Sequence, residues 1–206
     1  MATSTFILVT QGGTTKFHTV TEVIGADTVH QEVVKFGEPY LPGYVVRSGA
    51  AISVAVANDH VLQIVAGSSL KVRIRRIEIY QVTLATTVAI ATWNIVRLTS
   101  AGTGGTGVAA AALETSDAAA GATAMTLPTA KGTEGTVILP FTTYFMQTLA
   151  ASNQLVNPIA VIDFDLPRTK PLIIAAGTSN GIAIKNVTAV PAASVFVNVW
   201  LDETSF

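Results

Sequence analysis

The stretch Leu70-Lys-Val-Arg-Ile-Arg-Arg-Ile-Glu-Ile-Tyr80 carries the clearest secondary-structure signal in the chain. Its first half alternates apolar and basic residues, and such period-two alternation is typical of a half-buried β-strand. The phase of the alternation changes after Arg75-Arg76, because Ile77 and Ile79 then carry the apolar face. One inserted residue that shifts the phase indicates a β-bulge. The sequence therefore predicts one long strand with a bulge at Arg75-Arg76.

Short runs with the same character occur along much of the remaining chain. Turn residues separate them, and Pro140 and Pro158 are among these residues. We expect strands at residues 52–57, 61–66, 81–89, 91–98, 136–139, 142–147, 159–164, 172–176, 182–187 and 194–201. No long amphipathic helix is present to cover a parallel sheet. The fold class expected from this pattern is all-β, an antiparallel sandwich or jelly roll.

Three local features refine this expectation. Asn180-Gly181 lies between two apolar runs and predicts a tight hairpin. Residues 108–113 are rich in Ala and favour one or two helical turns. Residues 118–129 are rich in Ala, Gly and Thr, which predicts a long loop that crosses between the sheets.

The first 45 residues differ from the rest of the chain. Threonines are spread among short apolar pairs, and Pro39 and Pro42 enclose Tyr40-Leu41. This composition favours extended and turn conformations. Two interpretations remain open: residues 1–45 are an N-terminal arm that packs on a neighbouring subunit, or they are edge strands of the domain at 46–206.

Composition excludes several classes of protein. The 206 residues contain no Cys, which excludes a disulfide-stapled module, a Cys-ligated zinc site and a thiol enzyme. Half of the residues are hydrophobic, too many for a disordered chain. The apolar runs are interrupted by Pro, Gln, Asn and Thr, so no membrane span and no targeting segment is expected. The net charge of −1 argues against nucleic-acid binding by the chain as a whole.

Charged residues are scarce, at 12% of the chain, and two groups of them stand out. Four basic residues on the long strand could meet phosphates, pair with an acidic neighbour on this or another subunit, or form a solvated face. Asp163 and Asp165 lie on one face of a strand and could bind a cation or act as acid and base. Neutralisation by Arg168 and Lys170 is the simpler account of this pair. The candidate interface residues are Lys71, Arg73, Arg75, Arg76, Asp163, Asp165 and Arg168.

Other motifs point to no chemistry. Gly102-Thr-Gly-Gly-Thr-Gly107 matches a dinucleotide fingerprint, but the βαβ context that the fingerprint needs is missing, so a hairpin or interface loop is expected. The three histidines have no metal-ligand spacing. Trp93 and Trp200 lie in alternating strands, which favours burial of both. Asp202-Glu203 is expected to be a solvated end. We therefore expect no enzyme, no cofactor and no metal, although a cleft that joins Asp163, Asp165 and a histidine would reopen the enzyme class.

Several segments from about residue 60 to residue 206 share a pattern with one known family. They are residues 70–79, 101–107, 118–128, 131–135, 163–165 with 171–177, and 180–188. On these segments the chain resembles structural proteins of tailed-bacteriophage virions. The N-terminal third departs most from that pattern, and no catalytic residues come with the resemblance.

The resemblance implies a virion component made in the host cytoplasm. Small size, low charge and the candidate arm fit a capsid decoration (cement) protein, which stabilises the head lattice through its subunit interfaces. Its partners would be the major capsid protein and copies of itself. The copies are expected to form a homotrimer at the three-fold positions of the capsid lattice. A tail, head–tail connector or baseplate component is the alternative within this class, and a ligand-binding β-sandwich module is a more distant one.

Overall fold

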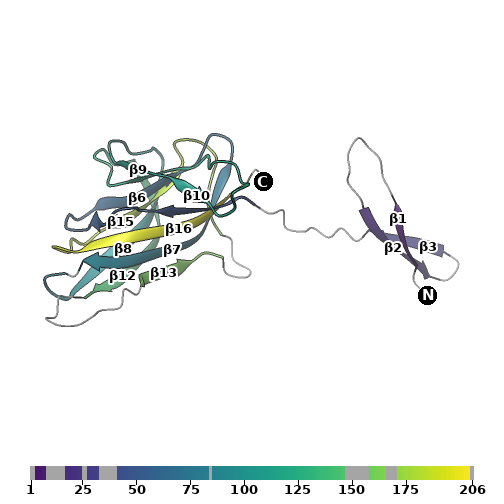
Figure 1. Ribbon diagram of the computed structural model, residues 1–206, viewed down its shortest axis with the longest axis horizontal. Helices are drawn as coiled ribbons and strands as arrows, with labels where there is room; N and C mark the ends of the chain where they lie inside the picture. Colours follow the sequence, from purple (N-terminus) through teal and green to yellow (C-terminus); the bar gives the residue numbers. More distant parts are fainter. Residues whose placement is uncertain are drawn as a thin grey trace. The chain divides into compact units, whose positions relative to one another are not determined.

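The computed structural model describes residues 3–7, 17–24, 27–32, 41–83, 85–146, 158–165 and 171–204, with side chains from residue 41 onwards. Every helix or strand in these residues is a β-strand, which confirms the all-β prediction. The chain divides into two compact units, Met1–Tyr40 and Leu41–Phe206 (Figure 1). In the described residues, no helix has the length and apolar character that crossing a membrane requires.

The first unit contains a small antiparallel sheet. Its strands are β1 (Thr3–Ile7), β2 (Phe17–Ile24) and β3 (Asp27–Glu32), in the order β1-β2-β3. The central strand pairs Thr21 with Thr3 on one side and with His30 on the other. A role for this part of the chain as an arm on a neighbouring subunit remains a prediction.

The second unit is a sandwich of two antiparallel sheets that lie face to face (Figure 1). We name the sheets after their central strands, β7 and β8. The β7 sheet has the order β10 (Ala110–Ala112), β4 (Gly43–Arg47), β16 (Ser194–Thr204), β7 (Lys71–Thr83), β13 (Pro158–Asp163), with β5 (Ile52–Ser53) on β16 and β14 (Leu172–Ile174) on β7. The β8 sheet has the order β12 (Glu134–Phe145), β8 (Ala89–Leu98), β15 (Gly181–Asn186), β6 (Asp59–Val65), β11 (Thr123–Thr126), β9 (Thr106–Val108).

The chain alternates between the sheets in a defined way. It passes from β4 to β6, back to β7 and across to β8, which pairs with β12. It then returns to β13, crosses to β15 and ends in β16 between β4 and β7. Two interlocking four-stranded sets with these crossings form a jelly roll. The expected fold class is therefore confirmed, and the strand order favours the jelly roll over other sandwiches.

The core lies between the two sheets. Ile74 and Val199 from the β7 sheet and Ile184 from the β8 sheet are all almost fully buried in one cluster. Trp93 is its largest buried side chain, and its indole N–H donates to Thr143 Oγ1 over 2.8 Å. The hydrogen bond supplies the polar partner that a buried indole needs. The prediction that Trp93 lies in the core is confirmed.

The predicted bulge is present in β7. Opposite it on β16, Trp200 pairs with Arg76 and Leu201 with Ile74, so Arg75 is the extra residue. The strand continues through this point, and Arg75 and Arg76 both lie on its exposed face. The bulge thereby restores the core-facing phase for the isoleucines that follow.

Several local predictions are wrong. No hairpin forms at Asn180-Gly181, since β14 belongs to the β7 sheet and β15 to the β8 sheet. Residues 108–113 contain the last residue of β9 and all of β10 in place of helical turns. The chain does cross between the sheets from β10 to β11, but β11 lies inside the segment 118–129 that was expected to be a loop. The two strands expected on either side of Pro140 are one strand, β12 (Glu134–Phe145), because β12 is an edge strand where the missing N–H of a proline is tolerated.

Candidate functional site

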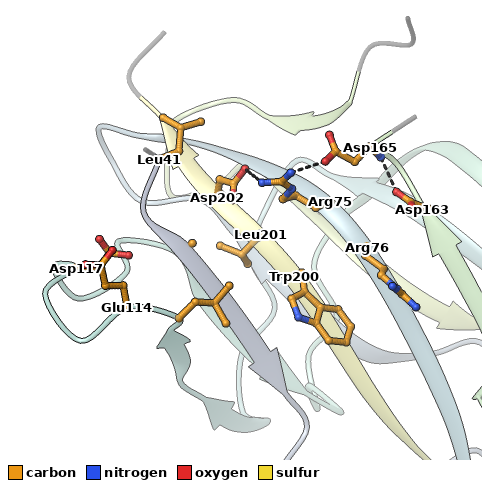
Figure 2. Close-up of a pocket in the computed structure, with 12 residues that line it drawn as sticks. Leu41, Arg75, Arg76, Glu114, Asp117, Asp163, Asp165, Trp200, Leu201 and Asp202 are labelled. Atoms are coloured by element: carbon orange, nitrogen blue, oxygen red, sulfur yellow. Dashed lines mark hydrogen bonds and ion pairs between the residues drawn. The ribbon is translucent and has the colours of Figure 1, made fainter. Parts of the chain in front are cut away.

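The charged residues that the sequence singles out meet on the outer face of the β7 sheet (Figure 2). Asp165, just after β13, accepts hydrogen bonds from Arg73 and Arg75. Arg73 Nη2 lies 2.5 Å from Asp165 Oδ1. These hydrogen bonds, from Arg75 first and then Arg73, hold the pKa of Asp165 below its ordinary value. The basic strand therefore has an acidic neighbour within its own chain.

Arg75 also reaches a buried carboxylate on β16. Its Nη1 lies 3.3 Å from Asp202 Oδ2, and the Asp202 side chain is only 5% exposed. Burial raises the pKa of Asp202, while the nearby Arg75 and Arg73 oppose that rise. Arg75 thus links β7, β16 and the residues after β13 (Figure 2).

The expectation of a solvated end at Asp202-Glu203 is wrong. Glu203 is 3% exposed. Its carboxylate accepts the backbone N–H of Gly121 over 3.0 Å and of Ala122 over 2.6 Å. It therefore anchors the segment between β10 and β11 to the end of β16.

Arg76 has a different environment from Arg75. Its Nη2 lies 2.5 Å from Glu78 Oε1, and its guanidinium carbon lies 5.8 Å from the centre of the Trp200 ring. Trp200 lies on the outer face of β16 and is partly exposed, so the prediction that it is buried is wrong. The reason is parity, because Val199 and Leu201 take the core-facing positions on either side of it.

The remaining predicted residues lie at the margins of this site or beyond it. Asp163, the last residue of β13, accepts the backbone N–H of Asp165 over 2.8 Å. Lys71, at the start of β7, is half-buried and pairs in register with Thr204. Arg168 and Lys170 lie outside the described residues, so neutralisation of the aspartates by this pair stays a prediction.

These side chains surround a hollow of about 540 Å³. Trp200 lies on its floor. The segment from Leu113 to Asp117 forms one wall, and Arg75 with its partners Asp165 and Asp202 lies opposite (Figure 2). Leu113 N donates to Gly43 O over 2.8 Å, which fixes the start of that wall. The residues that line the hollow are Leu41, Gly43, Arg75, Arg76, Leu113, Glu114, Asp117, Asp163, Asp165, Trp200, Leu201 and Asp202.

The sequence analysis singled out four of these twelve lining residues and missed the other eight. Glu114, Asp117 and Trp200 carried no motif, and only their positions in the folded chain bring them to the aspartates. Asp163 and Asp165 both line the hollow, but no histidine does. The condition set for an enzyme, a cleft that joins both aspartates with a histidine, is therefore not met by these lining residues.

The glycine-rich segment has a structural explanation. Gly102 N donates to Gln63 Oε1 over 2.9 Å, and a Cβ on Gly102 would come within 2.7 Å of that oxygen. The segment leads into β9. Its glycines therefore allow close backbone packing, whereas a dinucleotide would need a helix N-terminus at this point.

Gln63 begins a buried polar chain. Its Nε2 lies 2.5 Å from His60 Nδ1, and His60 Nε2 lies 2.9 Å from Glu134 Oε1. Because Gln63 Oε1 already accepts from Gly102, its amide must donate to His60, which therefore carries its proton on Nε2. In the described residues, no group of three or more His, Asp or Glu side chains is placed to hold a metal ion.

Comparison with protein-family models, with curated proteins and with solved structures finds no match to this chain. The conclusions on function therefore rest on the geometry above and on the resemblance described from the sequence.

Proposed function

We propose that this chain is a non-enzymatic structural protein of a bacteriophage virion, a decoration protein that stabilises the head lattice from the capsid surface. The observation that carries the proposal is an exposed apolar cluster at one end of β8 and β12. We call it the β8–β12 cluster, and it consists of Val88, Ile90, Tyr144 and Met146.

The apolar side chains of the β8–β12 cluster lie next to one another, whereas exposed apolar residues on a protein surface usually occur singly. Ile90 and Tyr144 are direct cross-strand partners, and they are 54% and 68% exposed. Val88 and Met146 beside them are 64% and 51% exposed. Grouped apolar side chains on a surface mark protein interfaces, because burial against a partner removes them from water.

A second copy of this chain is the first partner proposed for the β8–β12 cluster. The net charge of −1 leaves little repulsion between copies. β12 lies at the edge of its sheet, so its outer backbone groups are placed to pair with a strand from a neighbour. A homotrimer would match three-fold lattice positions, and the major capsid protein is the proposed second partner.

The fold and the resemblance support the same class. Jelly rolls occur in viral capsid proteins, although they also occur in lectins and cupins, so the fold alone assigns no function. One of the segments that carry the resemblance, residues 70–79, overlaps most of β7 at the centre of its sheet. A tail, connector or baseplate position would use the same surfaces.

A ligand-binding module is the second candidate function. One observation favours it, the partly exposed Trp200 on the floor of a charged hollow. The two functions are compatible, because the hollow lies on the β7 sheet and the apolar cluster on the β8 sheet.

Light scattering of the purified chain tests the proposal. We expect a trimer for the native chain and a monomer for the double variant Ile90→Thr, Tyr144→Thr, since Thr keeps strand propensity and removes apolar area. Val161→Thr is the matched control, because Val161 is 48% exposed but lies on the β7 sheet. A native chain that stays monomeric at high concentration, or a double variant that stays trimeric, would contradict the proposal.

A further inference from the structure

We propose that the hollow on the β7 sheet binds a neutral carbohydrate, with one sugar ring stacked on Trp200. This inference goes beyond the structural role and does not depend on it. It rests on the indole floor, on the mixture of ionised donors and acceptors around it, and on the fixed wall between β10 and β11.

The indole of Trp200 is suited to stack against a ligand. The ring is seen face-on in Figure 2, and the Arg76 guanidinium carbon lies over it, 5.8 Å from the ring centre, so a sugar would stack beside this cation on the remaining ring surface. No residue in the described part of the chain accepts a hydrogen bond from Trp200 Nε1. The C–H face of a sugar ring can bury apolar area on such a surface, while a sugar hydroxyl can accept the free N–H.

The rim of the hollow offers both donors and acceptors. Arg75 and Arg76 are cationic, whereas Glu114, Asp117, Asp163, Asp165 and Asp202 supply carboxylates. An anion would be repelled by the carboxylates, and a cation on the indole would lie beside the Arg76 guanidinium. A neutral polyhydroxylated ring avoids both costs, because its hydroxyls carry no charge and can donate to the carboxylates that the arginines do not engage.

The carboxylates divide into two sets with different roles. Asp165 and Asp202 are occupied by the arginines, and they hold the Arg75 guanidinium in position. Within the described residues, Asp117 on the opposite wall makes no side-chain hydrogen bond or ion pair, and Asp163 uses only one oxygen, to accept Asp165 N–H. These oxygens remain available for ligand hydroxyls.

The wall that carries Glu114 and Asp117 is held in place before any ligand arrives. Asp117 N donates to Glu114 O over 3.1 Å, and Tyr44 Oη donates to Ala118 O over 2.9 Å. The bonds from Gly121 and Ala122 to Glu203 fix the same segment further along. A rigid wall lowers the entropy cost of binding. The volume of about 540 Å³ falls in the size range of small-molecule sites.

The test is a titration of the full chain with a panel of methyl glycosides of common hexoses and N-acetylhexosamines, followed by NMR of the two indole N–H signals. Spermidine and citrate are the cationic and anionic competitors. We expect at least one glycoside to shift the Trp200 signal saturably while the Trp93 signal stays in place. Trp200→Ala should weaken that binding at least about tenfold, as loss of an aromatic anchor does, and Asp117→Asn should weaken it less.

Phe196→Ala is the matched control, because Phe196 is an exposed aromatic residue on the same strand that does not line the hollow. It should bind the glycoside as the native chain does. The proposal is overturned if no glycoside in the panel shifts the Trp200 signal, or if spermidine or citrate shifts it and the glycosides do not. It is also overturned if the Trp200→Ala variant binds the glycoside as tightly as the Phe196→Ala variant.

Discussion

Arg75, the extra residue of the β7 bulge, pairs with Asp165 after β13 and with the buried Asp202 of β16. Its two partners differ in burial, since the Asp165 side chain is 35% exposed and the Asp202 side chain 5%. The two contacts should therefore differ in their effect on stability. An exposed pair contributes little, whereas removal of Arg75 leaves a buried carboxylate without its cation.

Substitution of Arg75 should therefore cost more than substitution of Asp165. We expect Asp165→Asn to lower the free energy of unfolding by less than about 1 kcal/mol at pH 7. Arg75→Gln should lower it by about 1–3 kcal/mol, because Asp202 loses its partner. The difference should shrink in mild acid, since the pKa of Asp202 is raised and its protonated form needs no cation. Urea unfolding at pH 7 and pH 4 measures both effects, and equal losses at pH 7 would contradict this account.

The two ends of the glycine-rich segment should respond differently to alanine. A Cβ on Gly102 would meet Gln63 Oε1 at 2.7 Å and Ala130 O at 2.8 Å, whereas nothing lies within 4 Å of a Cβ on Gly107. We expect Gly102→Ala to lower stability by about 1–3 kcal/mol, the usual cost of overpacking. Gly107→Ala should change it by less than about 0.5 kcal/mol, as a surface substitution does. Thermal unfolding of both variants checks this, and similar melting temperatures would refute the packing role of Gly102.

Glu203 should hold the wall of the hollow. Glu203→Ala leaves the N–H groups of Gly121 and Ala122 without their acceptor, which should cost about 1–3 kcal/mol. Hydrogen exchange at these two amides should accelerate. Glu114→Ala is the control, because Glu114 is exposed and, among the described residues, its carboxylate accepts only from Ser116. Unchanged exchange at Gly121 and Ala122 in Glu203→Ala would show that other contacts fix the wall.

His60 should make the fold sensitive to acid. Burial lowers its pKa, although the hydrogen bond to Glu134 opposes the shift. The unfolded chain therefore takes up this proton more readily, and the free energy of unfolding should fall as the pH drops below about 6.5. Burial alone would raise the pKa of Glu134, but hydrogen bonds from His60 and Lys185 outweigh it and lower the pKa, so its contribution is lost only in stronger acid.

His60→Gln separates these two groups. The variant should be less stable than the native chain at pH 7, and its stability should change less between pH 7 and pH 5. Denaturant midpoints across this range measure the slope. A slope as steep as that of the native chain would assign the acid sensitivity to another group.

Prediction from the sequence succeeded where one strand carried its own signal. The alternation around Arg75-Arg76 predicts the bulge, because the phase change lies within a single strand and the isoleucines before and after it show which residues face the core. Prediction failed where contacts with another strand determine the structure. Gly181 looks like half of a hairpin turn, but a Cβ there would come within 2.6 Å of Ile64 O, so the glycine serves close strand packing.

The site was predictable only in part for the same reason. Arg73, Arg75 and Asp165 stood out as charges in an apolar chain, and they do meet. Trp200 was assigned to the wrong side of its strand, because alternation does not say which face is the core. Glu114 and Asp117 come from a segment that crosses from β10 to β11, and no local pattern places that crossing beside β16.

Co-sedimentation of the purified chain with phage heads that lack it tests the proposed role as a coat of the head. We expect saturable binding in a fixed ratio to the major capsid protein. The double variant Ile90→Thr, Tyr144→Thr should bind more weakly, and Trp200→Ala should bind as the native chain does. A chain that remains in the supernatant as a monomer at every concentration would contradict this role.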